Sequence, residues 1–215
     1  MRIDFIFDTV CPWCYVGKRR LMRALSMRPR GRLEIRWRPF LLNPEMPLEG
    51  IDRGTYLDRK FGGPSRVNRI HSAVTAAGRA EGIDFAFDRI SRTPSSLHSH
   101  RLVRFAERQG RDSDMVEAIY HAYFVEGLDI GAIDQLSAIA GRVGLDANEV
   151  RTFLMSDADI TTVMSDNARA HRLGVNGVPC IIIDGQYALA GAQEPDILMR
   201  LIDIAREGEP EVAIS

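Results

Sequence analysis

The stretch Arg2-Ile3-Asp4-Phe5-Ile6-Phe7 is followed by a three-residue connection and then by Cys11-Pro12-Trp13-Cys14. The first six residues alternate and are rich in aromatic and β-branched types, which predicts a strand. Apolar residues at helical spacing predict a helix from Pro12 to about Met27, and Pro12 suits its first turn because the missing N–H would be unpaired there. Residues 33–38 alternate again. The start of the chain therefore predicts a β-α-β unit with parallel strands.

The two cysteines of this stretch point to redox chemistry. The chain holds three cysteines, which is too few for a disulfide scaffold. Free amides and the dipole at the start of a helix stabilise a thiolate, so Cys11 is the predicted nucleophile. Cys14, one turn further along, can displace whatever Cys11 captures, and it is the predicted resolving cysteine.

A zinc site is the structural alternative for the same pair. Structural zinc usually has four ligands, often a second Cys-X-X-Cys or a His pair at suitable spacing. The remaining candidates are Cys180 and five scattered histidines, namely His71, His98, His100, His121 and His171. This shortage of ligands favours redox chemistry, and we expect no bound metal or cofactor.

The rest of the chain is read as a helical block followed by a return to strands. We expect helices near 53–61, 65–81, 96–109, 113–125, 132–143, 146–155 and 157–173, with Asp146 and Asp157 as N-caps and no strand between 43 and 173. Residues 180–184 and 187–190 then predict a hairpin with its turn at Gly185-Gln186, followed by a helix over 194–206. The order is β-α-β, a helical insert, then β-β-α.

A second motif, Gly177-Val178-Pro179, leads into the first strand of that hairpin. Together with Cys11-Pro12-Trp13-Cys14 it makes the chain resemble the DsbA-like oxidoreductases, and more narrowly their FrnE-type branch. Further matches are Trp37-Arg38-Pro39-Phe40, His100-Arg101-Leu102 and Gly191-Ala192-Gln193. The resemblance implies an α/β thioredoxin fold interrupted by a large all-helical insertion. Residues 1–42 and 174–215 would form the thioredoxin-like domain, and 43–173 the insertion domain.

The resemblance also implies site residues. The Val178–Pro179 bond should be cis and pack beside Cys11, with the Val178 backbone free to pair with a substrate strand. Pro12, Trp13 and Pro179 are then the active-site neighbours. Cys180 stands where an aromatic residue is commoner in the family, and we interpret it as a buried, inert thiol. A regulatory disulfide between Cys180 and Cys11 is the alternative.

His100 belongs to a stretch that departs from the family pattern. Ser95-Ser96 and Ser99 stand where the family usually has Asn-Thr and an alanine. We favour a packing or capping role for His100 over a catalytic one.

These motifs predict a thiol–disulfide oxidoreductase that acts on a protein, on glutathione or on another small thiol, with glutathione as a redox partner. One alternative is a glutathione-dependent enzyme of the kappa-class transferase or 2-hydroxychromene-2-carboxylate isomerase type, in which a serine usually replaces the first cysteine. Another is a peptide-binding holdase without catalysis. The direction of exchange and the oligomeric state stay open.

Composition narrows the partners. A net charge of −1 gives no bulk attraction to nucleic acid. No apolar run approaches the roughly 18 residues of a membrane span, and the N-terminus reads as a strand, so we expect a cytoplasmic protein that binds no membrane. Basic residues crowd between Lys18 and Arg38. They predict either a surface for anionic substrates or a solvated helix face.

Overall fold

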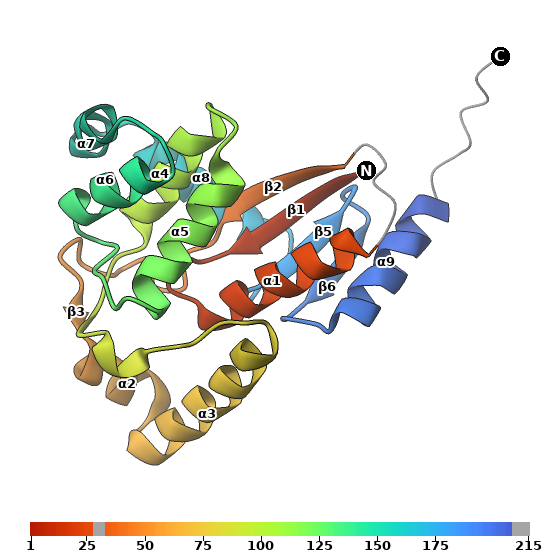
Figure 1. Cartoon of the computed structure of the whole chain (residues 1–215), viewed down its shortest axis with the longest axis horizontal. Coiled ribbons are helices and arrows are strands. Elements are labelled where there is room, and N and C mark those ends of the chain that lie inside the picture. The colour runs from red at the N-terminus through yellow and green to blue at the C-terminus, as the bar shows by residue number, and fades with distance from the viewer. Residues whose placement is uncertain (28–32, 208–215) are drawn as a thin grey trace.

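A computed structural model describes residues 1–27 and 33–207 of the chain. Residues 28–32 and 208–215, which hold three arginines of the basic run and the end of the predicted thioredoxin-like domain, lie outside the described residues. Figure 1 shows a central sheet with two helices lying along it and the other helices gathered beyond the end toward which the first strand runs. The order β-α-β, helical insert, β-β-α is confirmed, and the fold is a thioredoxin fold with a helical insertion.

The main sheet contains four strands in the order β2-β1-β5-β6. Strand β1 (Arg2–Phe7) pairs in parallel with β2 (Glu34–Pro39) and antiparallel with β5 (Cys180–Ile183), which pairs antiparallel with β6 (Tyr187–Ala190). Alternation along β1 places Ile3, Phe5 and Phe7 in the main core, while Ile6 packs in a smaller cluster on the second face. Ends of the chain that are far apart in sequence therefore meet at the middle of the sheet.

Helices cover both faces of this sheet. Helix α1 (Pro12–Ser26) packs against α9 (Pro195–Glu207), and both contribute buried side chains to the main core. On the second face, Ala170 of α8 (Ile160–Arg172) joins Ile6 and Phe40 in the smaller cluster. The predicted division of the chain at residues 42/43 and 173/174 stays a prediction.

The helical block agrees closely with the expected ranges. After α2 and after α3, which lies below α1 in Figure 1, the chain forms four further helices before α8. Their bounds are α2 (Arg53–Phe61), α3 (Pro64–Ala80), α4 (Leu97–Glu107), α5 (Asp112–Phe124), α6 (Ile133–Arg142) and α7 (Ala147–Met155), with a 3-10 turn, η1 (Phe87–Arg89), between α3 and α4.

Three local predictions for this block and the hairpin were wrong. A short antiparallel pair, β3 (Ile51–Asp52) with β4 (Arg92–Thr93), stands where no strand was expected, because two residues are too few to show alternation. Asp146 caps α7 as predicted, but α8 begins at Ile160 and not near Asp157. The hairpin turn centres on Asp184 and Gly185, both with positive φ, one residue earlier than expected.

Candidate active site

The two cysteines lie where β1 turns into α1. Cys11 is the N-cap residue of α1, with φ −97° and ψ 110°, and Pro12 opens the helix. The Cys14 N–H donates to the Cys11 carbonyl at 3.0 Å. The first turn, which the structure describes in full, carries no acidic side chain, so the helix dipole acts on the Cys11 sulfur without an opposing charge there. Cys11 is 5% exposed and Cys14 is 0% exposed, so Cys11 is the thiol that a substrate can approach.

The loop before β5 closes over this turn. The Val178–Pro179 peptide bond is cis, as the family resemblance implied, and the Cys11 Sγ lies 3.7 Å from the Val178 carbonyl oxygen, to which its thiol donates. Pro179 is buried and Val178 is half-buried. Gly17 makes this packing fit, because a Cβ at that position would lie 2.9 Å from the Pro179 Cγ. Residues 11, 17, 178 and 179 thus meet at one point, although 167 positions separate Cys11 from Val178.

Cys14 lies in a closed environment. Burial raises the pKa of its thiol well above the ordinary value of 9.0, and the hydrogen bond and charge of Cys11 act in the same direction. A hydrogen bond from the Asp8 backbone partly opposes this rise in the pKa of Cys14. At neutral pH the Cys14 thiol therefore stays protonated, and it must lose this proton before it can attack the Cys11 sulfur.

A buried acid and a buried imidazole lie under the same turn, and sequence reasoning missed the acid. Asp8 is 0% exposed; its Oδ2 accepts from the Leu42 N–H at 2.7 Å and its backbone carbonyl accepts from the Cys11 N–H at 3.1 Å. The His100 Nε2 lies 3.4 Å from the Asp8 Oδ1 but makes no hydrogen bond within the described part of the chain. The His100 ring packs against Phe7, with 4.9 Å between ring centroids. The sequence signal for this residue is an acid, Asp8, placed between an apolar strand and the cysteine pair.

Tyr120 on α5 is the second residue that sequence reasoning missed. Its hydroxyl donates to the Asp8 carbonyl at 3.2 Å. Burial raises its pKa well above 10.0, and the neighbouring Cys14 and Cys11 thiols add to this effect. The helical pattern of residues 113–125 gives no sign of its proximity to the cysteines.

The third cysteine lies apart from the pair. Cys180 follows Pro179 directly but packs with Ile6 and Phe40 on the second face of the sheet. Burial raises the pKa of its thiol. This environment agrees with an inert buried thiol, and pairing with Cys11 stays a hypothesis.

Each described cation of the basic run has a carboxylate partner. Lys18 and Arg19 both bind Glu117 of α5, and Arg20 and Arg23 both bind Glu81 after α3. On β2, Arg36 binds Glu34 and Arg38 binds Asp4. These cations fasten α1 and β2 to their neighbours. Of the two alternatives for this run, the surface for anionic substrates stays a prediction.

Over residues 1–27 and 33–207, no cluster of three or more His, Cys, Asp or Glu side chains has the geometry to hold a metal ion. In the same ranges, no helix is both long enough and apolar enough to span a membrane.

The fold and the cysteine turn define a class that comparison with known proteins also identifies. The model of the DSBA-like thioredoxin domain matches residues 2–203. The chain therefore belongs to the DsbA-like thioredoxin-domain family, and its members include disulfide oxidoreductases. Placement in the FrnE-type branch stays a prediction.

Individual relatives fit the same family. A probable DsbA oxidoreductase from Streptomyces coelicolor superimposes with a TM-score of 0.91 at 30% identity, covering 100% of this chain and 94% of that one. The 2-hydroxychromene-2-carboxylate isomerase of Sphingobium xenophagum is 25% identical over 86% of this chain and 89% of its own length. The cytosolic disulfide reductase DsbM from Pseudomonas aeruginosa, solved with glutathione, has a TM-score of 0.71 at 19% identity, covering 96% of this chain and 100% of that one.

Proposed function

We propose that this chain is a thiol–disulfide oxidoreductase in which Cys11 is the nucleophile and Cys14 resolves the mixed disulfide. One observation carries the proposal. Cys11 begins a helix, is the more exposed thiol of the pair, and lies 3.7 Å from the carbonyl of Val178 in a cis-proline loop. A helix N-terminus favours the thiolate, which is the form of cysteine that attacks disulfides.

The chemistry is a two-electron exchange. The Cys11 thiolate attacks one sulfur of the substrate disulfide, which forms a mixed disulfide and releases the other half as a thiolate. Cys14 then gives up its proton and attacks the Cys11 sulfur, which releases the second half and leaves a Cys11–Cys14 disulfide. The substrate gains the two electrons that the protein dithiol loses. A thiol reductant such as glutathione restores the dithiol by the same steps in reverse.

The Val178 backbone is the proposed guide for the substrate. Its carbonyl faces the Cys11 sulfur, and Val178 itself is half-buried at the edge of the loop. An extended substrate segment can pair with this backbone beside the attacking sulfur. Pro12, Trp13 and Pro179 then shape the surroundings of the reacting disulfide.

One of the named relatives supports a reducing role for the exchange. DsbM is a cytosolic disulfide reductase solved with glutathione. We propose by analogy that this chain works in the cytoplasm, reduces disulfides and draws its electrons from glutathione or a similar thiol. The isomerase relative keeps a glutathione-dependent isomerisation as the alternative function. Two cysteines at the turn favour exchange over isomerisation, because isomerisation needs no resolving thiol.

A trapping experiment tests the proposal. Cys14→Ala removes the resolving thiol, so substrates from cell extract should stay attached to Cys11 and be identified by mass spectrometry. Cys11→Ser with Cys14→Ala should trap nothing, and Cys14→Ala with Cys180→Ser should trap as much as Cys14→Ala alone. The absence of adducts at Cys11, or turnover that survives Cys11→Ser, would overturn the proposal. Client binding that survives Cys11→Ser without turnover would instead favour a holdase.

A further inference from the structure

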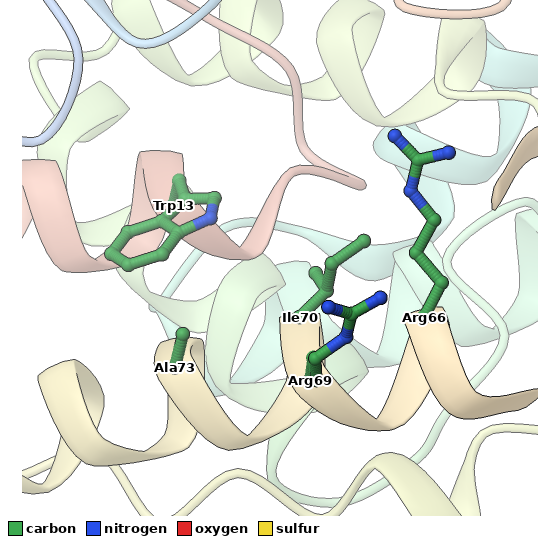
Figure 2. Close-up of a pocket in the computed structure, with 5 residues that line it drawn as sticks. All are labelled: Trp13, Arg66, Arg69, Ile70 and Ala73. Carbon is green, nitrogen blue, oxygen red and sulfur yellow. The ribbon is translucent and has the colours of Figure 1, made fainter.

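A hollow lies beside the redox turn, between Trp13 on α1 and one side of α3. Its volume is about 530 Å³, and it is lined by Trp13, Arg66, Arg69, Ile70 and Ala73. Figure 2 shows the Trp13 indole over Ala73, with Ile70, Arg69 and Arg66 following along α3 toward its N-terminus. Positions 66, 69, 70 and 73 fall on one face of a helix, because neighbours three and four apart share a face.

The two arginines of this hollow differ from those of α1. Arg20 and Arg23 are occupied by Glu81, whereas neither Arg66 nor Arg69 has a carboxylate partner in the part of the chain that the structure describes. Both side chains are exposed, and no acidic residue lines the hollow in the described ranges. Two guanidinium groups without a carboxylate partner in the described ranges thus line a hollow that also contains Trp13, two residues along the chain from the nucleophile.

Arg66 does not stabilise α3. The helix begins at Pro64, so Arg66 lies in its first turn, where the helix dipole disfavours positive charge. That turn, described in full, has no acidic side chain to compensate. An anion in the hollow would be attracted by both guanidinium groups and by the N-terminal end of the helix.

The other side of the hollow is apolar. Trp13 and Ile70 are half-buried, and Ala73 is small enough to leave space beneath the indole. A cavity of this size lies within the range of small-ligand sites. A flat or apolar group can stack on the indole while its acidic group meets the arginines.

We infer, on the basis of the proposed exchange reaction, that this hollow binds the carboxylate-bearing half of a small disulfide and so selects anionic small disulfides as substrates. The substrate disulfide then reaches the Cys11 sulfur past Trp13. Cys11 forms the new disulfide bond with one half, and the other half leaves as a thiolate.

Two aromatic disulfides of different charge test this inference on the reduced, full-length protein. Dithiobis-nitrobenzoate carries two carboxylates, and dithiodipyridine is neutral. Stopped-flow absorbance gives the rate constant of each reagent with Cys11. Arg66→Gln combined with Arg69→Gln should slow the anionic reagent about tenfold, the size expected of two exposed charge contacts. The neutral reagent should slow less than about twofold, and raising the salt concentration should remove most of the difference.

Arg79→Gln is the matched control, because Arg79 lies exposed in the last turn of the same helix and outside the hollow. It should leave both rate constants unchanged. Equal slowing of both reagents by the double variant, or slowing of neither, would overturn the inference. An acidic disulfide-bonded peptide serves as a third substrate. If the double variant slows only the reaction with this peptide, the inference is overturned, because the hollow would then bind polypeptides and not small disulfides. Failure of the proposed function is a separate result, in which neither reagent reacts with Cys11 faster in the folded wild-type protein than in the unfolded chain.

Discussion

His100 and Arg101 are neighbours in α4, both are buried, and they face different regions of the molecule. Arg101 faces the end of α7, where its guanidinium donates to the backbone carbonyls of Phe153, Leu154, Ser156 and Ala158 at 2.6–3.0 Å. A further contact at 2.9 Å joins it to the His98 Nδ1. His100 faces the redox turn, where its Nε2 makes no hydrogen bond within residues 1–27 and 33–207.

This difference indicates that Arg101 stabilises the fold, whereas His100 does not. Buried polar atoms are nearly always paired, so a fully paired arginine is the expected state of a structural residue. An unpaired imidazole next to a buried carboxylate is costly, and such groups concentrate at functional sites. The contrast predicts that substitution of Arg101 lowers the free energy of unfolding, whereas substitution of His100 changes the rate of disulfide exchange more than the stability.

The largest expected effect is at Arg101. Arg101→Ala leaves several carbonyls at the end of α7 without donors and opens a cavity, so the free energy of unfolding should fall by at least about 3 kcal/mol. Urea denaturation measures it. Arg142→Ala is the control, because Arg142 is exposed and pairs with Glu126 at 2.7 Å, and surface pairs contribute at most about 1 kcal/mol. Equal losses for the two variants would remove the contrast.

Gly17 tests how tightly the redox region is packed. Gly17→Ala places a Cβ 2.9 Å from the Pro179 Cγ, so the cis-proline loop must shift. Overpacking of this kind costs about 1–3 kcal/mol, and the rate of disulfide exchange should fall with it. Gly141→Ala is the matched control in α6, where the new methyl group meets only the Ala147 Cβ at 3.9 Å. It should raise stability by about 0.5–1 kcal/mol. An unchanged exchange rate in Gly17→Ala would show that the loop yields freely.

The fold was predictable because its signals are local. Alternation in residues 2–7 and 33–38, the cysteine pair and Pro12 fixed the β-α-β unit, and helical spacing fixed most of the insert. The β3–β4 pair was not predicted because it joins Ile51 to Thr93, which are far apart in sequence, and because two-residue strands are too short to show alternation.

The site was predictable only along the motif itself. Cys11 lies beside the Val178–Pro179 loop as expected, but Asp8 and Tyr120 join the site through a hydrogen bond between the residue that follows β1 and helix α5. The basic run between Lys18 and Arg38 looked like the candidate anion surface, yet Glu117 and Glu81 neutralise the part on α1. Which arginines stay unpaired depends on tertiary packing, so Arg66 and Arg69 could not be distinguished from the others by sequence.

The buried Cys14 thiol should make the stability of the protein depend on pH in the alkaline range. Burial raises the folded-state pKa of Cys14 well above 9.0, whereas an unfolded cysteine ionises near about 8.5. Below that pH both states hold the proton and the stability is fully present; above it the unfolded chain loses the proton first, so stability falls. Urea denaturation should show a loss of about 1–2 kcal/mol between about pH 8 and pH 10 that is smaller in Cys14→Ala. Identical slopes for the two proteins would contradict the assignment. Arg101→Lys should leave the slope unchanged.

The smallest effect on stability is expected at His100 itself. His100→Phe keeps a ring of similar shape against Phe7 and removes a nitrogen that bonds to nothing in the described chain, so the free energy of unfolding should change by less than about 1 kcal/mol. The Asp8 carboxylate loses the group 3.4 Å away and keeps its bond from the Leu42 N–H. The rate of mixed-disulfide release by Cys14 should therefore change, because the Asp8 carboxylate that acts on the Cys14 thiol then lies against an apolar ring. A loss of stability as large as that of Arg101→Ala, with an unchanged rate of release, would make His100 a structural residue like Arg101 and erase the distinction between the two neighbours.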